Sequence, residues 1–123
     1  MDRVIDELDS VIRKIVADAL AEDTGEGDED AVIGATIIAQ ESMVVAGRRW
    51  VDQVFTQLDD NIVIDWYIGD NETAETDDVI CKLVGPERAL RSGEHAALNF
   101  LQIQSAAATT RAKVDVAMVY RID

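Results

Sequence analysis

The sequence contains one cysteine, one histidine and one proline among its 123 residues. The lone Cys81 excludes an intrachain disulfide, and a zinc site built from several His and Cys ligands is excluded because His95 is the one histidine. Cys81 lies in the apolar run VICKLV, which favours a buried small hydrophobic side chain in a reducing interior over a nucleophile. Apolar runs of ~20 residues and a signal-peptide pattern are absent as well. We therefore expect a cytoplasmic protein with no membrane span.

Positive charge is also scarce, since 25 acidic residues stand against 11 basic ones and give a formal net charge of -14. A surface this negative repels phosphate backbones and anionic lipid headgroups, so neither nucleic acid nor a membrane is an expected partner. Asp is the favoured acid and Arg the favoured base. This bias fits a surface adapted to a salty cytoplasm, where the Debye length is roughly 3 Å at 1 M salt. An acidic domain from an ordinary organism fits it equally.

The apolar pattern predicts an α+β fold for one domain over residues 1–123. Helical spacing predicts a first helix over residues 2–21, and the acidic, glycine-containing segment 22–30 predicts a loop. Two short strands around a turn are expected within residues 32–46, followed by a helix that starts after Gly47.

Alternation of Ile62, Ile64, Trp66 and Ile68 with other residues predicts a half-buried strand, followed by a turn at Asp70 and Asn71. A further strand is predicted over 79–84, then a short helix over 87–91 after Pro86, and finally a long alanine-rich helix from Ala96 toward Asp123. The expected architecture is a small antiparallel sheet of about four strands packed with helices, with a long C-terminal helix.

The stretch GPERALRSGEHAALNFLQIQSAAATTR at residues 85–111 carries a specific resemblance. It holds the pattern GPxRAL, then a Glu followed by ALNFL, and then Ser before an Ala-Thr step. With LAEDTGEGD at 20–28 and MVVAGRRWVDQVF at 43–55, it resembles the N-terminal domain of quinolinate phosphoribosyltransferase, the carboxylating nicotinate-nucleotide pyrophosphorylase of NAD biosynthesis.

The resemblance implies transfer of a phosphoribosyl group from phosphoribosyl diphosphate to quinolinate, with magnesium in the complete enzyme. Family members continue into an α/β barrel, which carries most of the basic residues, and their N-terminal domain caps the barrel of the neighbouring subunit in a dimer. The 123 residues are too few for that barrel as well. We expect no cofactor and no catalytic residue in this chain, and as partner either a homo-oligomer or a separate barrel-bearing subunit.

His95 stands where the family has an arginine that reaches the substrate. An imidazole cannot grip a carboxylate with a fork as guanidinium does, so His95 either meets a dianionic ligand in its protonated form or bonds within the helix bundle. Arg91 and Arg88 lie just upstream, and Arg111 lies one residue from the family's position. These four residues are the candidates for substrate binding.

Two other functions stay open from the sequence. A non-catalytic binding or assembly module derived from this domain fits the His95 substitution and the short chain, with the alanine-rich helix as its interface. A biotinyl-like carrier would need an exposed lysine in a turn, whereas Lys82 lies within a strand pattern.

Overall fold

The computed structural model of the chain describes residues 2–20, 31–109 and 117–123, and the predicted acidic loop 22–30 lies outside them. Within the described residues, three helices and six strands follow one another. In chain order they are α1 (Asp2–Leu20), β1 (Val32–Ala39), β2 (Met43–Val44), α2 (Arg48–Leu58), β3 (Val63–Trp66), β4 (Thr73–Ala74), β5 (Val79–Pro86), α3 (Glu87–Thr109) and β6 (Met118–Ile122).

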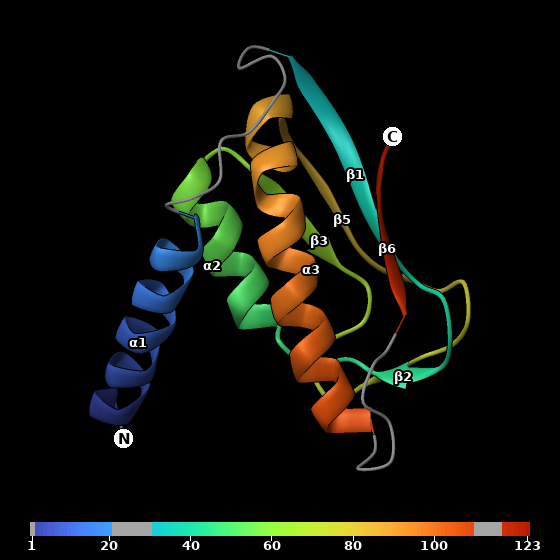
Figure 1. Cartoon of the computed structure of the whole chain (residues 1–123), viewed down its shortest axis with the longest axis horizontal. Coiled ribbons are helices and arrows are strands. Elements are labelled where there is room, and N and C mark those ends of the chain that lie inside the picture. The colour runs from blue at the N-terminus through green and yellow to red at the C-terminus, as the bar shows by residue number, and fades with distance from the viewer. Residues whose placement is uncertain (1, 21–30, 110–116) are drawn as a thin grey trace.

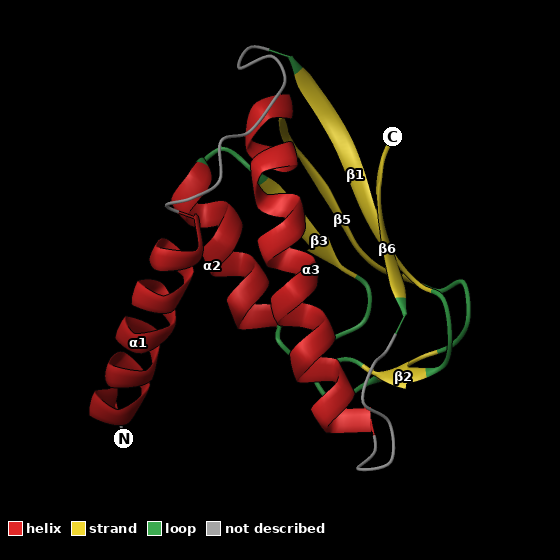
Figure 2. Cartoon of the chain, in the orientation of Figure 1, coloured by secondary structure: helices red, strands yellow, loops and turns green. Residues whose placement is uncertain are grey.

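Four strands form an antiparallel sheet in the order β3-β5-β1-β6, and β2 pairs with β4 in a separate two-stranded ribbon. Helices α2 and α3 lie side by side along one face of the sheet, while α1 packs beside α2 at the outer edge of the helical layer (Figures 1 and 2). The α+β class, the four-stranded antiparallel sheet and the long helix late in the chain are confirmed.

The core forms between the sheet and the two inner helices because the strands alternate. Ala35 and Ile37 of β1 and Cys81 and Leu83 of β5 are all fully buried, whereas Lys82 between the last two is exposed. From the helical side, Phe55 of α2 is the largest fully buried side chain. Cys81 is therefore a core residue, as its apolar surroundings in the sequence predicted.

Helix α3 runs without a break from Glu87 to Thr109, so the prediction of a short helix over 87–91 and a second helix from Ala96 was wrong. Ser92 and Gly93 lie between the two predicted helices. Both residues are buried in the structure, and a Cβ at Gly93 would overlap the ring of Phe55 and lie 3.0 Å from Leu58 Cδ1. Gly93 is thus a point of close approach between α2 and α3 rather than the end of a helix.

The expected continuation of the last helix toward Asp123 was also wrong, because β6 occupies Met118–Ile122 and pairs with β1. Met118 and Tyr120 alternate with less buried residues and enter the core. This alternation has the period of a strand, but it spans only five residues and follows an alanine-rich stretch of high helix propensity. The sequence pattern therefore favoured continuation of the helix.

The two strands expected within 32–46 exist, but they do not pair with each other. β1 joins the large sheet and β2 joins β4, with Met43 opposite Ala74. The expected turn at Asp70 and Asn71 has Asn71 at φ 68°, in the left-handed region that asparagine tolerates. No helix in the described part of the chain is both long and apolar enough to cross a bilayer.

Candidate functional site

Three of the four predicted substrate-binding residues lie on one face of α3. Arg88, Arg91 and His95 follow one another at steps of three and four, which places them along a single helical stripe, and all three are exposed. Arg111 lies outside the described residues. The structure thus brings together the residues in which the sequence pattern located the ligand contact, and their binding role stays a prediction.

Arg91 holds an ion pair within its own helix. Its Nε lies 2.7 Å from Oε2 of Glu87, four residues earlier, and both side chains remain partly exposed. An exposed pair of this kind contributes ~0.5 kcal/mol or less to stability. Glu87 therefore orients the Arg91 guanidinium through a weak pair that leaves the side chain exposed.

The opposite side of α3 is fixed to the rest of the fold. The hydroxyl of Tyr120 in β6 donates a hydrogen bond of 2.8 Å to the carbonyl of Leu90, which is fully buried. Burial, with a smaller contribution from Glu94, raises the pKa of Tyr120 above its ordinary value. The phenol therefore stays protonated at neutral pH and holds β6 against the helix turn that carries Arg91.

Most of the family-like motif in α3 has a structural role. Ala97 and Leu101 are buried in the core, and Phe100 packs its ring against Trp50 at a centroid distance of 5.0 Å. Ser105 and Thr109 hydrogen-bond to the backbone next to and within β2. The ALNFL run and the Ser and Thr that follow it thus fix the position of α3, while the stripe of Arg88, Arg91 and His95 stays exposed.

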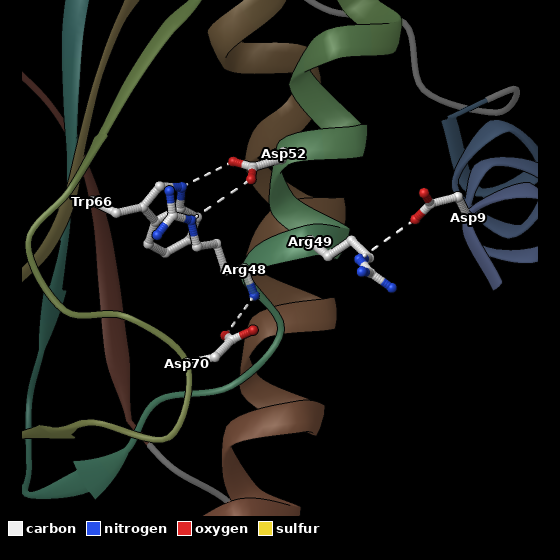
Figure 3. A network of polar contacts seen from close by, with 6 residues as sticks. All are labelled: Asp9, Arg48, Arg49, Asp52, Trp66 and Asp70. Carbon is white, nitrogen blue, oxygen red and sulfur yellow. Dashed lines mark hydrogen bonds and ion pairs between the residues drawn. The ribbon is translucent and has the colours of Figure 1, made fainter. Parts of the chain in front are cut away.

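A second polar cluster, which the sequence analysis missed, lies at the start of α2 (Figure 3). Asp52 Oδ1 accepts a 2.9 Å hydrogen bond from Trp66 Nε1, and its other oxygen lies 3.8 Å from Arg48 Nε. The Arg48 guanidinium lies over the Trp66 ring, 5.4 Å from its centroid. Burial raises the pKa of Asp52, although the hydrogen bond from Trp66 and the charge of Arg48 oppose that rise.

The same helix start is tied to two neighbouring segments. The backbone N–H of Arg48 donates to Asp70 Oδ1 at 3.1 Å, and Arg49 Nε lies 3.5 Å from Asp9 of α1 (Figure 3). An open cavity of about 260 Å³ lies beside them, lined by Leu8, Ile12, Ala46, Gly47, Arg49, Trp50, Asp70, Asn71 and Gln104. Both arginines of this cluster are engaged with carboxylates, so the cluster serves mainly to join α1, α2 and the turn after β3.

The spacing of Arg48 and Asp52, four residues apart in a helix, was a local signal for part of this cluster. The contact with Trp66 joins residues on different elements and had no signal in the sequence. Within residues 2–20, 31–109 and 117–123, no three His, Cys, Asp or Glu side chains gather where they could hold a metal ion.

These observations define a small α+β domain that presents a basic helix stripe and, in its described part, no metal-ligand cluster. Residues 14–105 match the family described as "Quinolinate phosphoribosyl transferase, N-terminal domain". The chain belongs to this family, which confirms the resemblance seen in the motifs.

Named relatives agree with this assignment. The chain is 32% identical over 116 residues to the chloroplastic nicotinate-nucleotide pyrophosphorylase [carboxylating] of Oryza sativa subsp. japonica, covering 86% of this chain and 31% of the relative. It is 31% identical over 105 residues to the probable nicotinate-nucleotide pyrophosphorylase [carboxylating] of Bacillus subtilis, covering 80% and 36%. The chain spans about a third of the length of these relatives.

Solved structures show the same correspondence. The nicotinate-nucleotide pyrophosphorylase from Francisella tularensis superposes with a TM-score of 0.76 at 33% identity, over 82% of this chain and 38% of that one. A structure from Streptococcus pyogenes titled NadC gives a TM-score of 0.74 at 28% identity, over 80% and 38%.

Proposed function

We propose that this chain is the capping and dimerisation domain of a quinolinate phosphoribosyltransferase, active only together with a barrel domain. The observation that carries the proposal is the exposed stripe of Arg88, Arg91 and His95 on a helix whose other side is fixed in the core. Family membership supports it, as does the match of this chain to about one third of the length of two carboxylating pyrophosphorylases.

The stripe suits a dicarboxylate such as quinolinate. Guanidinium groups bind carboxylates with two parallel hydrogen bonds, and Arg88 and Arg91 supply two such groups within one helical turn. A protonated His95 would add a third positive charge next to a dianion. In this arrangement the chain helps to hold and orient quinolinate, while phosphoribosyl diphosphate and magnesium bind on the barrel.

The test uses the tagged full chain purified at high salt from its source cells together with its partner. The assay supplies quinolinate, phosphoribosyl diphosphate and Mg²⁺ and measures diphosphate release. We expect turnover by the complex and none by the chain alone. Replacing both Arg91 and His95 by Ala should raise the KM for quinolinate at least tenfold and leave the KM for phosphoribosyl diphosphate nearly unchanged.

The matched control is Lys82→Ala, which removes an exposed positive charge from the outer face of the sheet. This substitution should change neither the KM for quinolinate nor the KM for phosphoribosyl diphosphate. A complex that contains a barrel protein but has no activity, or unchanged kinetics after the double substitution, would contradict the proposal. An inactive complex with a barrel protein would favour the non-catalytic assembly module, because the domain would then bind its partner without supporting the transfer reaction. We place this assembly in the cytoplasm.

A further inference from the structure

The cavity beside the start of α2 combines an apolar lining from the helices with a polar lining from a turn. Leu8 and Ile12 of α1 and Trp50 of α2 supply the apolar part, and the Trp50 ring is held by its contact with Phe100. Leu8 is 47% exposed, whereas Ile12 one turn later is buried, so Leu8 offers apolar surface to a ligand. The volume of about 260 Å³ exceeds the ~150 Å³ that holds benzene, so a small ring compound fits.

The polar part of the lining comes from the turn after β3, which is fixed to the segment before α2. The backbone N–H of Asn71 donates to the carbonyl of Val45 at 2.8 Å, and Asp70 Oδ1 accepts the backbone N–H of Arg48 at 3.1 Å. These bonds use one carboxylate oxygen of Asp70 and the backbone of Asn71. The other carboxylate oxygen and the Asn71 side-chain amide are therefore held in place for contact with a ligand, which lowers the cost of binding.

Gln104 of α3 brings a second amide to the cavity. Gly47 at the start of α2 has φ 106°, and a Cβ there would lie 3.0 Å from both Cβ and Cγ of Gln104. Glycine thus lets the aliphatic part of Gln104 pass close to α2. Within the described residues, the side-chain amides of Gln104 and Asn71 have no hydrogen-bond partner. Gln104 lies nine residues after His95, ~13 Å along α3, so the cavity is separate from the basic stripe.

The charges around the cavity favour a cationic ligand. Arg49 is a basic residue of the lining, but its Nε lies 3.5 Å from Asp9, and Figure 3 shows it on the other side of the start of α2 from Asp70. The Asp70 carboxylate accepts a backbone N–H, which leaves its negative charge in place. The whole chain carries a formal charge of -14, which attracts cations and repels anions.

We propose that this cavity binds a small primary amine with an apolar body, of the arylalkylamine class. The ammonium group has three N–H donors, which match Asp70 Oδ2 and the amide oxygens of Asn71 and Gln104. The apolar body lies against Trp50 and Leu8, where it covers surface that is otherwise open to water. This site does not rest on the proposed enzymatic function.

An NMR titration of the isotope-labelled full chain tests the site, with phenylethylamine as the probe at about pH 7, where its amine is protonated. We expect a dissociation constant of about 1 mM, with shifts in the side-chain signals of Asn71, Gln104 and the Trp50 indole. The Trp66 indole serves as an internal reference and should shift less, because its Nε1–H is bonded to Asp52. Phenylpropionate, which has the opposite charge, and methylamine, which lacks the apolar body, should each bind at least tenfold more weakly.

A substitution of equal size tests the role of the charge. Asp70→Asn removes the carboxylate but keeps an oxygen that can accept the N–H of Arg48, and it should raise the dissociation constant for phenylethylamine at least tenfold. The matched control is Asp65→Asn, which makes the same charge change at an exposed position opposite Lys82 in the sheet and should alter binding by less than about twofold. No shift in the three cavity signals, equal binding of phenylpropionate, or equal weakening by the two substitutions would each overturn the proposal.

Discussion

The hydroxyl of Ser105 bridges both backbone groups of Ala46, at 3.0 Å from its nitrogen and 3.1 Å from its oxygen. One turn later, the hydroxyl of Thr109 stands in the same relation to Val44, at 3.0 and 3.3 Å. Two side chains of α3 thus form hydrogen bonds with the backbone N–H and C=O groups of Val44 and Ala46. Without these side chains, the groups would need another partner, such as a neighbouring strand. The serine and threonine of the family-like motif act here as a connection between helix and ribbon.

Replacing Ser105 by Ala should destabilise the fold by about 1–3 kcal/mol, because the N–H and C=O of the half-buried Ala46 would lose the hydroxyl of a Ser105 side chain that is 0% exposed. Urea unfolding followed by circular dichroism measures the loss. Ser10→Ala, at an exposed position of α1, is the control and should change stability by less than ~0.5 kcal/mol. Equal effects of the two substitutions would contradict the bridging role.

Gly93→Ala should also destabilise the protein, although alanine normally improves a helix by about 0.5–1 kcal/mol over glycine. The added Cβ would overlap the ring of Phe55, and over-packing of this kind costs about 1–3 kcal/mol. Thermal unfolding of the variant should show a lowered midpoint. A raised midpoint would mean that α2 can move away from α3 without cost.

Cys81 should resist thiol reagents in the folded protein. It is 0% exposed, and burial, helped by the charge of Asp52, raises the pKa of its thiol to about 12. At pH 8 the native chain should therefore react with a disulfide reagent at least a hundredfold more slowly than the urea-unfolded chain. Comparable rates before and after unfolding would show that β5 opens readily in the native state.

Asp52 should make the stability depend on pH in an unusual direction. Because burial raises its pKa in the folded state above the ordinary 3.8, the folded chain holds this proton more tightly than the unfolded chain does. The stability of the wild type relative to Asp52→Asn should therefore fall as the pH rises from about 3 through the raised pKa. A relative stability that rises over that range would show that Arg48 and Trp66 outweigh the burial.

Salt should stabilise the chain if its acidic surface is adapted to a salty cytoplasm. The net charge of -14 creates self-repulsion that KCl screens, so the urea midpoint should increase between 0.1 and 2 M KCl. Sucrose at matched water activity controls for exclusion of cosolvent from the surface. An unchanged midpoint in KCl would leave an acidic domain of an ordinary organism as the explanation.

Local patterns in the sequence were sufficient for much of this fold. The alternation through Ile64 and Trp66 identified β3, and the helical spacing of Ile12 and Val16 identified α1, because each pattern repeats over several residues within one element. The buried state of Cys81 followed from the apolar residues on both sides of it. The stripe of Arg88, Arg91 and His95 was not accessible as one helix face, because the predicted elements, 87–91 and a helix from Ala96, left His95 outside both, whereas α3 is continuous.

The features that the sequence did not predict share a physical cause. In each of them, contacts between segments that are distant in the sequence determine the local structure. β6 is a strand because Tyr120 can pair beside Ile37 and donate to Leu90, and neither contact is visible locally. Helix α3 passes through Gly93 without a break, and the missing side chain of this glycine leaves room for the ring of Phe55. The cluster around Asp52 depends on Trp66, which the fold brings from another element.

The pairing of the last strand with the first has a consequence for synthesis on the ribosome. β1 emerges early, but the side of it that pairs with β6 has no partner until Met118–Ile122 have been translated. Asp123 then donates its N–H to Gly34, and its carboxylate accepts a hydrogen bond from Thr36. The nascent chain can assemble β1, β5 and α3 beforehand, yet the sheet gains its β6 edge only when Met118–Asp123 have left the exit tunnel.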